Sequence, residues 1–125
     1  MISVSPLKDM ELVKKLFCEN KFDFNENSGC VAAVDGDEVL GMCLYYLDNK
    51  GITVLSVEPK EDIMLADGIL RSALHVAAQI SAMDARYQGA EYEELFARLG
   101  FIKEKENKTL DIDKLFGGCC CSKNL

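Results

Sequence analysis

The densest group of reactive side chains is the run Cys119, Cys120 and Cys121. It follows Phe116-Gly117-Gly118, which predicts a flexible joint between a domain at residues 1–116 and a tail at 117–125. Thiolates are soft ligands that suit Cu(I) or Zn, but adjacent cysteines cannot all reach one tetrahedral ion, so a fourth ligand or a second chain is needed. Metal capture, redox reactivity and palmitoylation are open alternatives here. The simpler alternative is a disordered or simply packed terminus.

The sequence contains one histidine, His75. It shares a predicted helix face with Arg71 and Gln79, and this polar stripe is expected to face water, so we do not expect His75 to be catalytic. The sequence offers no convincing Ser/His/Asp arrangement, and it has neither a Walker motif nor a dinucleotide-binding glycine pattern.

Composition excludes several classes of partner. The formal charge of −7 argues against nucleic acid and against anionic membrane surfaces. A length of 125 residues with 49% hydrophobic residues predicts one domain with a packed core. No run reaches the length of a membrane span, and the first residues lack the features of a secretion signal. Cys18, Cys30 and Cys43 lie in apolar patterns, so we expect free thiols and a reducing, cytoplasmic location.

The elements are organised around a strand at 52–57 and the helix that follows it. Pro59 ends the strand, because its ring fixes φ and supplies no amide to a ladder. From Asp62 onward the apolar residues recur at helical spacing, and Glu61 and Asp62 suit a helix start, where acidic side chains are favoured. The predicted inward face of this helix comprises Ala66, Ile69, Leu70, Ala73, Leu74, Ala77 and Ile80.

The first part of the chain predicts a strand at 2–5 and then a helix that reaches Cys18. Ser5 is the expected N-cap of that helix, with Pro6 at its first position. The polar segment 19–29 is most simply a loop whose phenylalanines, Phe22 and Phe24, anchor it on the core; the alternative is a loop that lines a substrate cleft.

The rest of the chain completes an α+β pattern. Strands at 30–34 and 38–47 flank a hairpin turn, with Gly41 expected at a bulge or a close backbone approach. A weakly supported strand lies at 84–89, a helix at 91–99 with Gly100 as its C-terminal cap, and two strands at 101–105 and 109–112. A mixed, mostly antiparallel central sheet flanked by helices is therefore predicted.

A family resemblance appears in the last helix. The run Leu95-Phe96-Ala97-Arg98-Leu99-Gly100-Phe101 resembles the helix-to-strand signature of the GNAT N-acetyltransferases, in which Leu-Tyr-x-x-x-Gly-Phe is usual. Val57-Glu58-Pro59 with Gly68-Ile69-Leu70 behind it resembles the central strand and cofactor helix of that family. The order of elements from Ile2 to Ile112 also fits, if the family's second helix is reduced to the 19–29 loop.

The resemblance implies acyl transfer from acetyl-CoA to an amine, either a small molecule or a peptide. The backbone of Leu55 and Val57 would pair with the pantetheine arm, and the amides at Gly68, Ile69 and Leu70 would meet the phosphates. The loop before them departs from the family pattern, because it has one glycine, no arginine, and carboxylates at Glu61, Asp62 and Asp67.

The resemblance also suggests the proton-transfer groups. Phe96 replaces the family's tyrosine and cannot donate a proton, whereas Tyr92 lies one turn earlier and is the candidate acid. Glu58 is the candidate base, and a water molecule is the alternative. The simpler alternatives are an exposed strand-end carboxylate for Glu58 and a partly buried ring with a surface hydroxyl for Tyr92. The rival functions are a non-catalytic GNAT-like module that works through its cysteine tail, and an interaction protein that uses an exposed sheet edge. A homodimer is a separate open alternative.

Overall fold

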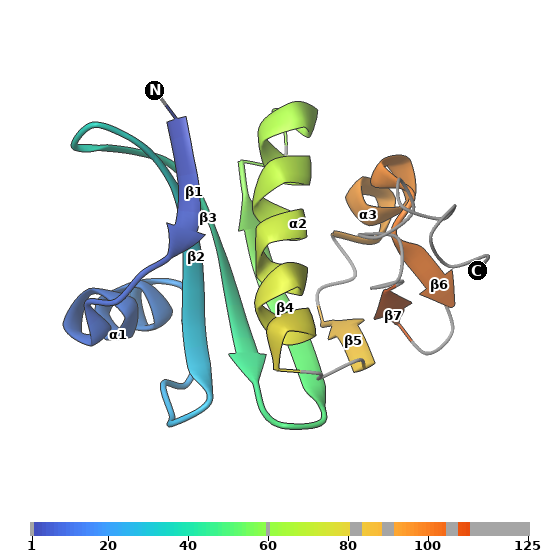
Figure 1. Ribbon diagram of the computed structural model, residues 1–125, viewed down its shortest axis with the longest axis horizontal. Helices are drawn as coiled ribbons and strands as arrows, with labels where there is room; N and C mark the ends of the chain where they lie inside the picture. The colour runs from blue at the N-terminus through green and yellow to red at the C-terminus, as the bar shows by residue number, and fades with distance from the viewer. Residues whose placement is uncertain (1, 60, 81–83, 89–91, 105–107, 111–125) are drawn as a thin grey trace.

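The computed structural model describes residues 2–59, 61–80, 84–88, 92–104 and 108–110. This part of the chain forms three helices and seven strands (Figure 1), and the predicted α+β class is confirmed. The elements are β1 (Ile2–Pro6), α1 (Met10–Glu19), β2 (Ser28–Asp35), β3 (Glu38–Leu47), β4 (Gly51–Glu58), α2 (Ile63–Gln79), β5 (Asp84–Tyr87), α3 (Glu93–Leu99), β6 (Ile102–Glu104) and β7 (Thr109–Leu110).

The strands form one sheet in the order β1-β2-β3-β4-β5-β7-β6. Every neighbouring pair is antiparallel except β4 and β5, which run parallel because α2 crosses from the end of one to the start of the other. Figure 1 shows α2 lying across the face of the sheet, with α1 at the β1–β2 side. The mostly antiparallel sheet expected from the sequence is confirmed.

Each face of the sheet has its own apolar cluster. The larger cluster lies under α2, and the smaller one lies under α1 and includes Val13, Phe17, Leu44 and Leu55. Cys43 belongs to the first cluster and Cys30 to the second. Burial raises the pKa of the Cys30 thiol to about 12 and raises that of Cys43 as well, so both remain protonated and behave as small apolar side chains.

The predicted inward face of α2 is confirmed with one exception. Asp62 is the N-cap of the helix, and its side chain accepts a hydrogen bond from the amide of Leu65. Ile80 follows the last helical residue and is 52% exposed, because the helix ends at Gln79 before its side chain reaches the sheet. The fully buried residues of the face are Ala66, Ile69, Leu70, Ala73, Leu74 and Ala77.

The predicted start of α1 is wrong. Pro6 pairs with Val31 in the β1–β2 ladder, so the strand continues through the position expected to begin the helix. Proline is tolerated there because β1 is an edge strand with only one ladder to maintain. The N-cap is Asp9, whose carboxylate accepts from the amides of Glu11 and Leu12 at 3.1 and 3.3 Å.

The segment between α1 and β2 is a loop held by aromatic contacts. The rings of Phe22 and Phe24 meet Phe17 edge-on at 6.4 and 5.9 Å, and the Tyr46 hydroxyl donates to the carbonyl of Asp23 at 2.6 Å. The anchored-loop interpretation is therefore confirmed.

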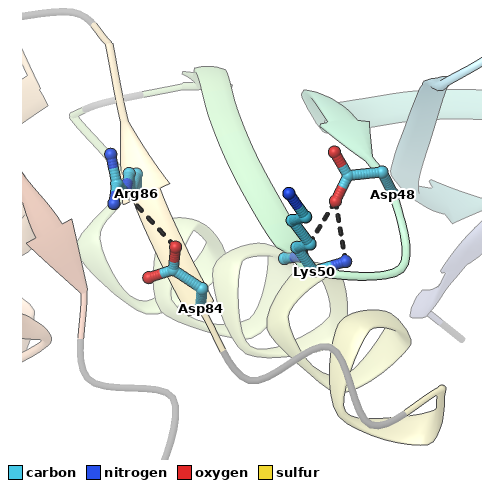
Figure 2. Close-up of polar contacts among 5 residues, drawn as sticks. Asp48, Lys50, Asp84 and Arg86 are labelled. Atoms are coloured by element: carbon cyan, nitrogen blue, oxygen red, sulfur yellow. Dashed lines mark hydrogen bonds and ion pairs between the residues drawn. The ribbon is translucent and has the colours of Figure 1, made fainter.

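The start of β4 is fixed by a tight turn. Figure 2 shows Asp48, whose Oδ1 accepts hydrogen bonds from the amides of Lys50 and Gly51 at 2.8 and 3.0 Å. Beside it, Asp84 and Arg86 of β5 form an exposed ion pair at 3.4 Å. The Asp84 amide donates to the Lys50 carbonyl at 3.3 Å, where β4 and β5 begin to run together.

Candidate active site

The structure brings the two candidate proton-transfer residues together. The Tyr92 hydroxyl donates a hydrogen bond to Glu58 Oε2 at 2.9 Å. Glu58 is the last residue of β4, and Tyr92 immediately precedes α3. Tyr92 is 5% exposed, and its hydroxyl meets a carboxylate, so the alternative of a hydroxyl that ends at the surface does not hold.

Glu58 and Tyr92 meet beyond the point where β4 and β5 stop pairing. β4 pairs with β5 only from Gly51 to Val54, and the Gln88 amide donates to the Val54 carbonyl at 3.1 Å just beyond the last pair. In Figure 1 β5 accordingly lies beside the beginning of β4 and not its end. Among the described residues, no strand pairs with the β5-facing edge of β4 at 55–58. The backbone of that section is therefore open to a ligand that adds as a strand.

The end of β4 carries its polar side chains on the α1 face. The β3–β4 ladder shifts register between Leu44 and Tyr45, and beyond this bulge Leu44 lies opposite Ser56 and Met42 opposite Glu58. Leu44 is part of the apolar cluster under α1, and Met42 packs against that cluster. The side chains of Ser56 and Glu58 therefore lie on the α1 face of the sheet. The buried Ser56 Oγ has no hydrogen-bond partner among the described residues.

Gly41 fixes the position of this strand end. The β2–β3 ladder shifts register opposite Leu40 and Gly41, as a bulge requires. A Cβ on Gly41 would collide with the carbonyl oxygen of Glu58 and would lie 2.8 Å from both Ile69 Cδ1 and Pro59 Cδ. The expected bulge and the expected close approach are both confirmed, and Glu58 is the residue approached.

A pocket of about 370 Å³ opens on the α1 side of Glu58. Its lining is mainly apolar, and α1 contributes Leu12 and Leu16 while β3 contributes Val39 and Met42. Glu58 and Glu61 are the charged residues of its described lining. Glu58 thus contacts the pocket on one side and Tyr92 on the other.

Aromatic rings support Tyr92 from α3. Its ring stacks on Phe96 with centroids 6.0 Å apart and planes at 22°, and Tyr87 meets Phe96 edge-on at 5.2 Å. Burial, and then the Glu93 carboxylate, raise the pKa of Tyr87, whose hydroxyl donates to Glu93 Oε2 at 3.3 Å. Phe96 is fully buried, so the family's tyrosine position here lies inside the aromatic cluster.

The predicted cofactor-binding residues lie in two different places. The side chains of Leu55 and Val57 are buried on opposite faces of β4, so only their backbone is available at the open edge. Gly68, Ile69 and Leu70 lie in the interior of α2, which begins at Ile63, where helical amides bond to carbonyls four residues earlier. The first-turn amides that an anion meets at a helix end belong instead to residues 63–65.

That helix end fits a phosphate group poorly. The Asp62 carboxylate accepts from the Leu65 amide at 3.1 Å and places a negative charge where a phosphate would lie. Arg71 does not offset it, because its guanidinium pairs with Asp67 at 3.0 Å and lies 5.1 Å from the centroid of the Phe101 ring. The open edge of β4 fits a pantetheine arm, whereas the helix end opposes the phosphates.

Other predicted features fall outside this site. Cys119, Cys120 and Cys121 lie outside the described residues, as does the predicted joint at 116–118. Within the described part of the chain no group of three metal-ligating side chains occurs, and Cys18, Cys30 and Cys43 are free thiols. None of the helices in that part is both long and apolar enough to cross a membrane.

Sequence reasoning missed the pocket beside Glu58. Its walls come from α1 and β3, two elements to which the sequence alone assigned no binding role. The available signal was that α1 has more apolar residues than its contact with the sheet needs. Val13 and Phe17 are buried under the helix, whereas Met10 and Leu12 are 48% and 36% exposed. Glu61 also had a second role, because it lines the pocket while Asp62 alone caps the helix.

Comparison with known proteins identifies the fold. No protein-family model and no curated protein sequence matches the chain. A GNAT-family acetyltransferase structure from Streptococcus pneumoniae is 19% identical with a TM-score of 0.54, covering 82% of this chain and 88% of that one. A GNAT-family protein from Desulfovibrio desulfuricans is 13% identical with a TM-score of 0.56, covering 83% and 87%.

A third structure shares the same arrangement. The ribosomal-protein-S18-alanine N-acetyltransferase from Escherichia coli is 11% identical with a TM-score of 0.58, covering 87% of this chain and 88% of that one. These matches span nearly the whole sheet and its helices at low sequence identity, so they bear on the fold. This chain has the fold of the GNAT family of acetyltransferases.

Proposed function

We propose that this chain transfers an acetyl group from acetyl-CoA to a primary amine, with Glu58 as the general base and Tyr92 as the general acid. The observation that carries the proposal is the 2.9 Å hydrogen bond between these side chains at the point where β4 separates from β5. An exposed carboxylate or a surface tyrosine would need no such partner. The GNAT fold supports the same chemistry.

The pair suits a single proton-transfer cycle. The amine nitrogen attacks the thioester carbonyl, a C–N bond forms, and the C–S bond breaks. Glu58 accepts the proton that the nitrogen loses, and Tyr92 gives its hydroxyl proton to the departing thiolate. Because Tyr92 already donates to Glu58, the proton on Glu58 can return to the tyrosine and restore both groups.

The substrate thioester would lie along the open edge of β4. Backbone groups between Leu55 and Val57 would hydrogen-bond to the pantetheine arm as to a neighbouring strand. Asp62 would weaken the hold on the phosphates, so we expect modest affinity for acetyl-CoA.

The test is an acetylation assay with reduced, metal-free protein, acetyl-CoA and a panel of primary amines. Products are followed by mass spectrometry, because the six cysteines would react with thiol-detecting dyes. We expect Glu58→Gln to lower kcat by about 10²-fold or more, the usual contribution of a general base. Glu94→Gln, on the exposed face of α3, is the matched control and should keep full activity.

Two further results decide between this proposal and its rivals. A triple alanine variant of Cys119, Cys120 and Cys121 should remain active, because the tail takes no part in the proposed chemistry. Calorimetry that finds no binding of acetyl-CoA at millimolar concentration, together with no product from any amine, would overturn the proposal.

A further inference from the structure

The apolar pocket on the α1 side of Glu58 has a shape and charge that restrict its ligand. Its volume of about 370 Å³ is at the small end of the range for small-molecule sites, roughly 300–1,000 Å³. Two of its wall residues, Leu12 and Val39, are 36% and 57% exposed. Filling the pocket with an apolar group would remove both from water, which is favourable in proportion to the area buried.

The charge of the pocket has one sign. Glu58 and Glu61 line it, and none of its described lining residues is a lysine, arginine or histidine. A ligand with a carboxylate would therefore be repelled, and one with a single ammonium group would be attracted. A polycation would satisfy the carboxylates but leave the leucine, valine and methionine walls exposed to water.

We propose that this pocket binds the acceptor and that the acceptor is a small primary amine on an uncharged aliphatic or aromatic body. This inference rests on the proposed function, since it assigns the second substrate of the same site. The apolar body occupies the space between α1 and β3, and the amino group points to Glu58. The thioester lies on the other side of Glu58, at the open edge of β4, so the base stands between the two substrates.

The test compares hexylamine and benzylamine with ethanolamine, glycine and spermidine as acceptors. We expect the apolar amines to have kcat/KM values at least tenfold higher than the others. Leu12→Gln and Val39→Gln, on opposite walls, should each raise the KM for benzylamine severalfold while leaving the KM for acetyl-CoA unchanged. Met10→Gln is the matched control, because Met10 is similarly exposed on α1 but does not line the pocket.

Binding measured without acetyl-CoA separates this inference from the proposed function. Titration of benzylamine, followed by NMR, should give saturable binding that Leu12→Gln weakens and Met10→Gln does not. Equal turnover of polar and apolar amines would overturn the inference and leave the transferase intact, and a preference for a peptide with an N-terminal phenylalanine would overturn its small-molecule part. If no amine is acetylated while benzylamine still binds in this variant-dependent way, the proposed function fails and the pocket assignment stands.

Discussion

The hydroxyl of Tyr92 and the carboxylate of Glu58 are joined by a 2.9 Å hydrogen bond that spans the gap between the end of β4 and the start of α3. This bond ties the α3 side of the sheet to the central strand just where β5 no longer pairs with it. It also places a tyrosine hydroxyl and a carboxylate together, with a pocket lined by Glu58 on one side and, among the described residues, an unpaired edge of β4 on the other.

Removing the tyrosine hydroxyl should affect the chemical step more than substrate binding. We expect Tyr92→Phe to lower kcat by about 10²-fold, because the thiolate loses its proton donor, with KM for acetyl-CoA nearly unchanged. Tyr87→Phe is the matched control, since Tyr87 also packs on Phe96 but donates to Glu93. Steady-state kinetics on both variants provides the measurement, and equal losses in the two would show that the Tyr92 hydroxyl only supports the local structure and does not transfer a proton.

Restoring the family's tyrosine at position 96 should not restore the family's chemistry. Phe96 is fully buried between the rings of Tyr92 and Tyr87. Phe96→Tyr would place a hydroxyl in this cluster, and a buried hydroxyl without a partner destabilises a protein by roughly 1–3 kcal/mol. Urea denaturation should therefore show lower stability without a gain in kcat, and a more active variant would contradict the assignment of the acid role to Tyr92.

Two glycines allow a paired test of backbone packing. Gly41→Ala should destabilise the fold by roughly 1–3 kcal/mol, because its Cβ would collide with the Glu58 carbonyl and with Pro59 and Ile69. Gly68→Ala should instead stabilise it by up to about 1 kcal/mol, because the residue is helical and a Cβ there meets no described residue within 4 Å. Urea denaturation of both variants measures the difference. A rise in KM for acetyl-CoA in Gly68→Ala would show that the cofactor approaches α2 at this glycine.

The parts of the fold that local pattern determines were predictable. The inward positions of α2 follow from helical periodicity, and the role of Gly41 follows from a glycine inside an alternating strand. The start of α1 was not predictable, because proline is favoured at the first position of a helix and is also tolerated in an edge strand. Pairing with Val31, which depends on the tertiary fold, decided between them.

The site was predictable in its residue types but not in its geometry. Glu58 and Tyr92 were selected by resemblance, yet they stand 34 positions apart, and their contact depends on how α3 returns to β4. The pocket was even harder to predict, because the sequence does not distinguish an exposed Leu12 from a buried Val13. Its existence depends on how far α1 stands from β3.

The turn before β4 gives a prediction on acid stability. Hydrogen bonds from the Lys50 and Gly51 amides lower the pKa of Asp48 below its ordinary 3.8. A lowered pKa in the folded state adds stability above the unfolded pKa, and this contribution is lost as the pH falls through the folded value. Asp48→Asn, which resembles the protonated acid, should be less stable than the wild type near neutral pH and equally stable well below 3.8. Urea denaturation across this range checks the sign, and a gap that widened in acid would refute it.

The carboxylate at the start of α2 should oppose the phosphates of acetyl-CoA, so its removal should tighten binding. Asp62→Asn keeps an N-cap acceptor for the Leu65 amide and removes one negative charge. Two charges 4 Å apart in water interact by about 1 kcal/mol, which corresponds to about fivefold in Kd. Asp23→Asn changes the net charge equally and is the matched control. The Asp23 backbone carbonyl is held by Tyr46, which pairs with Thr53 near the start of β4, whereas α2 follows the end of β4. Calorimetry at low salt should show tighter binding for Asp62→Asn alone, with the gain shrinking as salt is added. Equal affinities for the two variants would place the phosphates away from this helix end.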